Sequence, residues 1–152
     1  MRVKAFLFAL CCILLLGACG TPKTGGTVYN IMDYGAKGDG VTDDAAAIQT
    51  AIDQCSKSGG GTVLVPAGRI FMCSPFHLAS FVELHLEPNS CLLANPDEAA
   101  YSLSAFRDNR GEGMMWIYGQ DLKEVSITGT GTIDGNGVSF MGKELEDSYE
   151  LK

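Results

Sequence analysis

Two periods of hydrophobic residues divide the chain. In its first half, apolar side chains recur at the three- and four-residue spacing of one helix face, at Ala45, Ile48, Ala51, Ile52 and Cys55. Thr42 and Asp43 can cap the first free N–H groups of a helix, and Gly59-Gly60-Gly61 supplies a stop. The pattern predicts an α-helix near residues 43–57.

Beyond this helix the period changes to two. Residues 62–65 (T-V-L-V) are apolar on both faces, as in a strand buried in a parallel sheet. Residues 82–87 alternate apolar and polar side chains, which is typical of a half-buried strand. Turns at Gly, Pro and Asn separate further predicted strands, which lie at residues 28–31, 69–73, 91–94, 114–118 and 125–128. Residues 95–113 are polar and irregular, and we expect them to form an inserted loop.

The order of these elements favours a solenoid. No second helix follows, which argues against a doubly wound sheet, and no Asn-Gly turn joins two clear strands. We expect an all-β parallel solenoid, with a β-sandwich as the alternative. A solenoid exposes an apolar cross-section at each end, so the helix near 43–57 is expected to cap the first coil, over Val63 and Val65.

Residues 127–137 (I-T-G-T-G-T-I-D-G-N-G) are the last recognisable coil. Glycines alternate there with β-branched residues, so strand and turn are expected to follow each other within a few positions. The charged stretch from Gly142 onward offers no comparable cap. The predicted β-helix is therefore incomplete, with unpaired strand edges at its C-terminal end.

The first residues indicate export. Arg2 and Lys4 precede an apolar run at residues 6–16, which is too short to span a bilayer and is followed by small residues. Residues 1–18 are therefore predicted to be a signal peptide, rather than a membrane anchor or a core helix. Leu16-Gly17-Ala18-Cys19 resembles a bacterial lipobox, which implies lipidation of Cys19 and a tether at residues 19–27; ordinary secretion is the alternative.

The charge of the chain limits its expected binding partners, and its cysteine count limits the expected disulfides. The chain has 11 Lys+Arg and 18 Asp+Glu, for a net charge of −7, and loss of residues 1–18 makes it more acidic still. An acidic chain is unsuited to generic nucleic-acid binding, so no nucleic-acid partner is expected. After removal of the signal peptide and use of Cys19, an odd number of cysteines remains (Cys55, Cys73 and Cys91), and we expect buried free thiols.

Motifs for chemistry are incomplete. Residues 137–144 approach a phosphate-binding loop, but Glu144 stands where a hydroxyl is needed. Asp39, Asp43 and Asp44 lack the spacing of a calcium loop, and helix capping explains them better. His77 and His85 have no nearby Cys or Asp at ligand spacing, so we expect them to be solvated or held by structural hydrogen bonds. These residues predict no catalytic, cofactor-binding or metal-binding group.

Three motifs nevertheless resemble one enzyme family. They are D-Y-G-A-K-G-D-G at residues 33–40 with T-D-D at 42–44, G-G-T-V-L-V-P-A-G at 60–68, and V-S-I-T-G through I-D-G-N-G at 125–137. In this order they are similar to family 28 glycoside hydrolases, the polygalacturonases, within the pectate-lyase superfamily. That resemblance implies a single-stranded, right-handed parallel β-helix over residues 28–152 and no cofactor. It also implies inverting hydrolysis of pectin-like polysaccharide, with one Asp as general acid and others activating water.

The family's catalytic motifs are missing. Asn-Thr-Asp, Gly-His-Gly and Arg-Ile-Lys do not occur, and the Asp43-Asp44 pair belongs to the first of the three motifs above. No catalytic residue is carried over. The first hypothesis is the N-terminal part of an exported, lipid-anchored polygalacturonase of the bacterial cell envelope, inactive alone. The alternative is a non-catalytic β-helix lipoprotein that binds polysaccharide or a partner.

Overall fold

The computed structural model describes residues 26–102, 115–145 and 148–151, and its strands form stacked coils. Sheet A has the order β1-β3-β6-β9, and sheet B the order β2-β4-β7-β10. The sheet A strands are β1 (Val28–Asn30), β3 (Gly61–Val65), β6 (Val82–Leu86) and β9 (Ser126–Gly129). The sheet B strands are β2 (Asp39–Asp43), β4 (Ile70–Cys73), β7 (Cys91–Ala94) and β10 (Thr132–Asp134). A third pair, sheet C, joins β5 (Phe76–His77) to β8 (Ile117–Tyr118).

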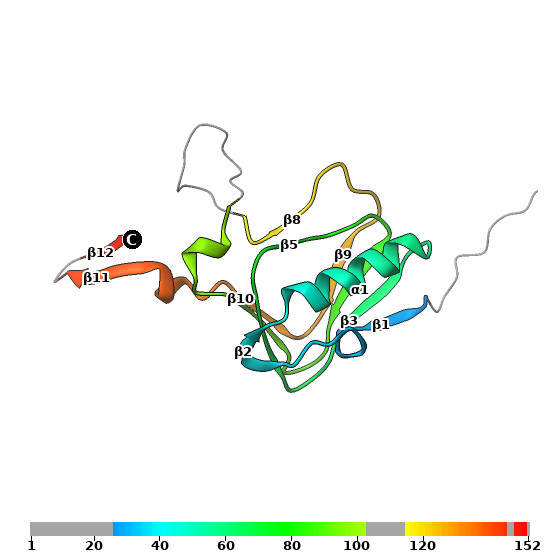
Figure 1. Ribbon diagram of the computed structural model, residues 1–152, viewed down its shortest axis with the longest axis horizontal. Helices are drawn as coiled ribbons and strands as arrows, with labels where there is room; N and C mark the ends of the chain where they lie inside the picture. Colours follow the sequence, from blue (N-terminus) through cyan, green and yellow to red (C-terminus); the bar gives the residue numbers. More distant parts are fainter. Residues whose placement is uncertain (1–25, 103–114, 146–147, 152) are drawn as a thin grey trace, which may run out of the picture.

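Every pairing within sheets A, B and C is parallel. The chain passes from sheet A to sheet B, and in the second and third coils on to sheet C, before it returns one coil higher. Such a path is that of a single-stranded parallel β-helix, so the predicted fold class is confirmed (Figure 1).

Inward-facing side chains stack in register from coil to coil. In sheet A, Val63 pairs with Leu84 and Leu84 with Ile127. In sheet B, Phe71 pairs with Leu92 and Leu92 with Ile133. The first two members of each stack are fully buried, whereas Ile127 is 46% and Ile133 42% exposed. The interior is therefore complete in the lower coils and open along the last one.

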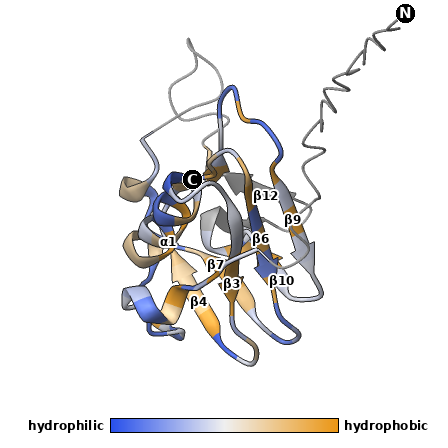
Figure 2. Cartoon of the chain, turned by 90° about the vertical axis from the view of Figure 1, so that its right-hand side faces the viewer, coloured by the Kyte–Doolittle hydropathy of each residue, from blue (hydrophilic) through white to orange (hydrophobic). Residues whose placement is uncertain are grey.

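Helix α1 (Ala45–Lys57) covers the other end. Its buried residues are Ile48, Ala51, Ile52 and Cys55, which belong to the predicted apolar stripe. The helix packs on β3, β1, β5 and the short 3-10 helix η1 (Ile31–Tyr34), as the capping prediction requires. Figure 2 shows α1 on one side of the stack of strands and β9 and β10 on the opposite side.

The start of α1 differs in detail from the prediction. Asp43 ends strand β2, although it was predicted to lie at the start of the helix, and the helix begins at Ala45. The Asp43 carboxylate does cap it, since Oδ1 accepts a hydrogen bond from the Ala45 N–H at 3.0 Å. Asp44 instead accepts from the N–H groups of Lys37 and Gly38, and so closes the preceding glycine-rich loop.

Several other elements were not predicted. Strand β5 is too short for a period to be recognised. The charged tail contains η3 (Gly137–Phe140) and an antiparallel pair of strands, β11 (Met141–Leu145) and β12 (Ser148–Leu151), which extends away from the coils in Figure 1. The predicted inserted loop includes η2 (Glu98–Ala100), and its residues 103–113 lie outside the described residues.

Cys55 and Cys73 are buried free thiols as predicted, whereas Cys91 is partly exposed. Burial raises the pKa of Cys73 to about 12, which makes it unreactive at neutral pH. Cys19, the predicted signal peptide and most of the predicted tether lie outside the described residues. Among the described residues, no helix is long and apolar enough to cross a membrane.

The glycine-rich coil gives a matched test of the fold. Gly129 has φ of 97°, and a Cβ there would collide with the carbonyl oxygen of Leu86 in the coil below. Gly135 has no positive φ, and a Cβ added to it would meet no heavy atom within 4 Å. We expect Gly129→Ala to lower the free energy of unfolding by at least about 2 kcal/mol, because it combines backbone strain with a backbone clash.

Gly135→Ala is the control, with an expected change under about 1 kcal/mol. Urea denaturation followed by circular dichroism measures both. Equal effects of the two substitutions would contradict the close coil-to-coil contact at Gly129.

Candidate functional site on the outer face of sheet A

Several acidic residues serve the backbone rather than a ligand. Hydrogen bonds from the N–H groups of Thr42 and Val41 lower the pKa of Asp39 to about 2. Burial opposes ionisation of Asp43, but hydrogen bonds from Ser74 outweigh it and lower its pKa. Asn95, one coil further on, donates to the Ser74 hydroxyl at 3.0 Å. The residues considered for calcium are thus occupied in loop closure, capping and a polar stack across sheet B.

A second polar stack lies on the outer face of sheet A. Glu83 on β6 accepts hydrogen bonds from two threonines on the neighbouring strands: Thr62 Oγ1 at 3.0 Å on β3, and Thr128 Oγ1 at 2.6 Å on β9. These bonds lower the pKa of Glu83, with the bond from Thr128 contributing most. The carboxylate is therefore ionised at neutral pH and held in place across three coils.

The same network fixes the tautomer of His85. Its Nδ1 lies 2.7 Å from Thr128 Oγ1, whose single hydroxyl hydrogen is donated to Glu83. Thr128 can then only accept from the imidazole, so the geometry assigns the hydrogen to Nδ1. His85 thus makes a structural hydrogen bond, which is one of the two outcomes expected from the sequence.

His77 is bonded in a different way, on sheet C. Gln49 of α1 accepts from the His77 backbone N–H at 2.9 Å and donates to its carbonyl at 3.2 Å. The imidazole packs at 5.9 Å on the ring of Tyr118, and its Nε2 lies 3.8 Å from Asp53. These contacts join the capping helix to sheet C, and they give His77 a structural role.

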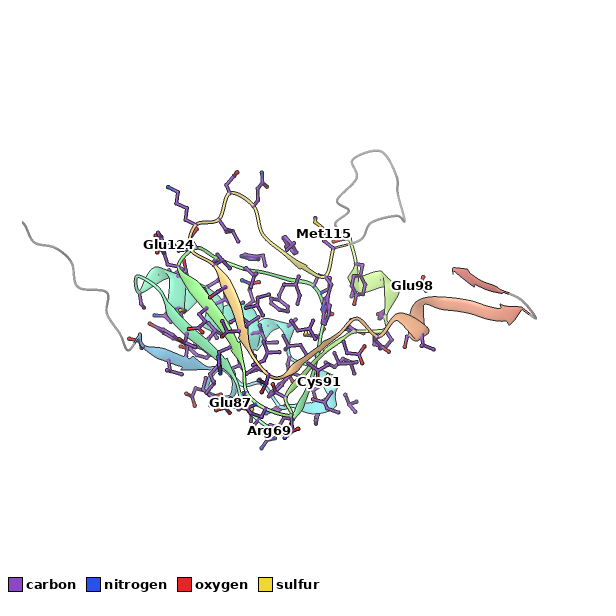
Figure 3. All side chains as sticks on the ribbon, turned by 180° about the vertical axis from the view of Figure 1, so that it is seen from behind. Arg69, Glu87, Cys91, Glu98, Met115 and Glu124 are labelled. Atoms are coloured by element: carbon purple, nitrogen blue, oxygen red, sulfur yellow. The ribbon has the colours of Figure 1, made fainter. Side chains whose placement is uncertain are left out.

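A cavity of about 610 Å³ lies beside Glu83, at the ends where the chain enters the sheet A strands. Its lining includes Phe81, Glu83, Glu124 and Ser126. Figure 3 labels Glu124, which lies at the opposite end of sheet A from Glu87. The sequence analysis missed Phe81, although an aromatic residue one position before the inward-facing Val82 has the parity of an outward-facing side chain.

The chemistry of these groups favours binding over proton transfer. A general acid needs a carboxyl group whose pKa is raised, so that it holds a proton near neutral pH. Asp39, Asp43 and Glu83 all have lowered pKa values and act as hydrogen-bond acceptors. In the part of the chain that the structure describes, no group of three His, Cys, Asp or Glu residues could hold a metal ion.

A stack of parallel coils with a helical cap and polar outer stacks defines a parallel β-helix. Residues 28–138 match the family described as rhamnogalacturonase A/epimerase, pectate lyase-like, and the chain belongs to this family. The family resemblance drawn from the three sequence motifs is thereby confirmed at the level of the superfamily.

Two relatives illustrate the range of the family. The chain is 62% identical over 116 residues to mannuronan C5-epimerase AlgE4 of Azotobacter vinelandii, covering 76% of this chain and 21% of that protein. It is 34% identical over 120 residues to a protein of Vitis vinifera named "Probable polygalacturonase", covering 71% of this chain and 24% of that protein. The chain therefore spans about a quarter or less of these relatives.

The chain is also similar to solved structures. The exopolygalacturonase of Thermotoga maritima shares 36% identity with a TM-score of 0.61, over 72% of this chain and 25% of that one. The family 28 exopolygalacturonase of Yersinia enterocolitica shares 25% identity with a TM-score of 0.62, over 84% of this chain and 25% of that one.

The Glu83 network predicts a pH dependence of stability. The pKa of Glu83 is lower in the folded chain than its ordinary value of 4.5. Its contribution to stability is therefore complete above the ordinary pKa and is lost as the pH falls through the folded value. We expect Glu83→Gln to be less stable than the wild type at pH 7 and to lose less stability on acidification from about pH 5 to pH 3.

Chemical denaturation at several pH values measures this difference. Glu98→Gln removes the same charge from the exposed helix η2 and is the control. If the stability of Glu83→Gln changed with pH by the same amount as that of the wild type, the hydrogen bonds from Thr62 and Thr128 would not be what holds the Glu83 carboxylate ionised.

Proposed function

We propose that these coils are the N-terminal section of a glycoside hydrolase that cleaves a polymer of uronic acids, of the polygalacturonase type. The carrying observation is the stack of inward-facing residues, which is closed by α1 at one end and ends on the half-exposed Ile127 and Ile133 at the other. Burying a leucine- or isoleucine-sized side chain fully contributes about 1.5–3 kcal/mol, so both positions favour a further coil above them.

The reaction proposed is hydrolysis with inversion, as in family 28. Such chemistry uses a protonated carboxyl group as general acid and a second carboxylate about 6.5–9.5 Å away to activate water. Asp39, Asp43 and Glu83 are unsuited to the acid role because their pKa values are lowered. We therefore assign the reacting carboxyl groups to coils stacked above β9 and β10, and to these coils the role of scaffold.

A comparison of two proteins tests this assignment. The product of the full reading frame containing these residues is expected to release reducing ends from polygalacturonate, with inversion seen by ¹H NMR of the first product. The 152 residues alone are expected to release none, because they lack the reacting pair. Hydrolysis by the 152 residues, or unsaturated or epimerised products from the longer protein, would contradict the proposal.

We also propose that the protein is exported and anchored to the bacterial cell envelope through Cys19. The support is the apolar run that ends on Leu16-Gly17-Ala18-Cys19. Two or more acyl chains are needed for stable anchoring, and a lipobox cysteine receives them on its sulfur and its new N-terminus.

Partitioning of the protein between a detergent phase and an aqueous phase tests whether it carries this lipid anchor. The wild type expressed in a bacterium is expected to enter the detergent phase, and Cys19→Ser to move to the aqueous phase because no sulfur remains to acylate. Cys91→Ser is the control; it removes a different thiol, one that is partly exposed, and is expected to partition like the wild type. Detergent-phase recovery of Cys19→Ser would disprove lipidation at this residue.

A second candidate is a non-catalytic β-helix lipoprotein that binds polysaccharide. The cavity on sheet A favours it, since that cavity combines an exposed ring with fixed hydrogen-bond acceptors. In this case the product of the complete reading frame would bind glycan and cleave none.

A further inference from the structure

The cavity on sheet A is built by the turns that enter three successive strands. Gly60, Phe81 and Glu124 precede β3, β6 and β9 respectively, and all three line it. Its volume of about 610 Å³ falls within the range of small-molecule sites. The turns stack as the coils do, so the cavity runs across the coils rather than along a strand.

Phe81 is held toward solvent by its backbone. Its φ is 66°, a conformation that is rare for a bulky residue, and its side chain is 45% exposed. Two backbone hydrogen bonds hold it there: its N–H donates to the Lys123 carbonyl at 2.9 Å, and its carbonyl accepts from the Gly61 N–H at 3.1 Å. Gly60 allows this approach, because a Cβ there would lie 2.8 Å from the Phe81 Cβ.

The polar lining consists of acceptors and hydroxyls. Glu83 is ionised and has its two oxygens positioned by Thr62 and Thr128, each of which leaves further lone pairs of the carboxylate available. Glu124 and Ser126 complete this side. Among the described residues that line the cavity there is no Lys or Arg, although Lys57 and Lys123 are near in sequence.

These groups select a ligand class. The face of an aromatic ring is negative and attracts the weakly positive C–H groups of a sugar face, while carboxylates accept hydrogen bonds from sugar hydroxyls. An anionic sugar would be repelled by Glu83 and Glu124, since no lining cation compensates them. Uncharged sugars carry both the C–H faces and the hydroxyl donors without that repulsion.

We propose that the cavity of Phe81, Glu83 and Glu124 is a binding site for an uncharged hexose oligosaccharide, separate from the proposed hydrolytic centre. The ring of Phe81 forms the platform, and the two glutamates accept hydroxyl hydrogen bonds. The site lies wholly within the described coils, so it does not depend on whether the protein cleaves a polyuronate. It would give a chain of this family a contact with neutral parts of a polysaccharide.

Titration of the 152-residue chain with two oligosaccharide probes tests the site. Galactotetraose is the neutral probe and tetragalacturonate the acidic one, and binding is followed by isothermal titration calorimetry and by ¹H–¹⁵N spectra. The neutral probe is expected to bind more tightly and to shift the amide signals of Gly60, Glu83 and Ser126. Phe81→Asn is expected to weaken binding by at least about tenfold, as removal of an aromatic anchor does.

Asn tolerates a positive φ, so this variant removes the ring and keeps the backbone. Val41→Asn, at another exposed apolar position, is the control and is expected to bind like the wild type. Glu124→Lys reverses one lining charge and is expected to raise the ratio of acidic to neutral binding. The proposal is overturned if neither probe binds, if the acidic probe binds the wild type as tightly as the neutral one, or if Phe81→Asn binds like the wild type while remaining folded.

Discussion

The in-register stacking of inward-facing side chains is the constraint on which the other features depend. Val63, Leu84 and Ile127 follow one another in sheet A because each coil returns the chain to the same position one strand higher. Parallel register fixes the face of every neighbouring residue, so the outward residues must also stack. The Glu83 ladder and the cavity at Phe81 are consequences of the same repeat that forms the core.

Both ends of such a stack need cover, and the chain treats them differently. In the second and third coils, the sheet B strands β4 and β7 are followed by the sheet C strands β5 and β8. In the first coil, the sheet B strand β2 is followed by α1 instead. One helix thus replaces a strand and closes the interior with Ile48 and Ile52. At the other end Ile127 and Ile133 keep inward-facing positions without full burial, which is the arrangement that an additional coil would complete.

The sequence predicted what depends on period and composition. The stripe of α1 and strands such as β6 were recognisable because several residues repeat one spacing. Strand β2 was missed because most of its side chains are polar and it is defined by pairing with β4, a contact distant in sequence. Strand β5 was missed because two residues have no period, and the antiparallel β11 and β12 because charged residues carry little β-preference.

The site could be predicted only in part for a related reason. His77 and His85 were expected to be solvated or structurally bonded. Their hydrogen-bond partners, Gln49 and Thr128, lie 28 and 43 residues away and cannot be chosen from the sequence. Phe81 has no motif around it, and its exposure follows from backbone bonds to Gly61 and Lys123. Parity with Val82 would have indicated an outward-facing side chain, but only the fold brings Phe81 beside Glu83 and Glu124.

The charge of the sugar distinguishes the two proposed binding roles, for a polyuronate and for an uncharged oligosaccharide. A polyuronate carries one negative charge on each sugar, and its binding requires cations to offset the repulsion of an acidic protein. The cationic side chains that the structure describes are Lys37, Lys57, Arg69 and Lys123, and none of them lines the cavity. Arg69 lies at the turn beside Glu87 and Cys91 (Figure 3), and it donates to the Lys37 carbonyl. Recognition of a uronic acid polymer at this cavity would therefore require positive groups that its lining does not contain, whereas the acidic, ring-lined cavity on sheet A has the chemistry for uncharged sugars.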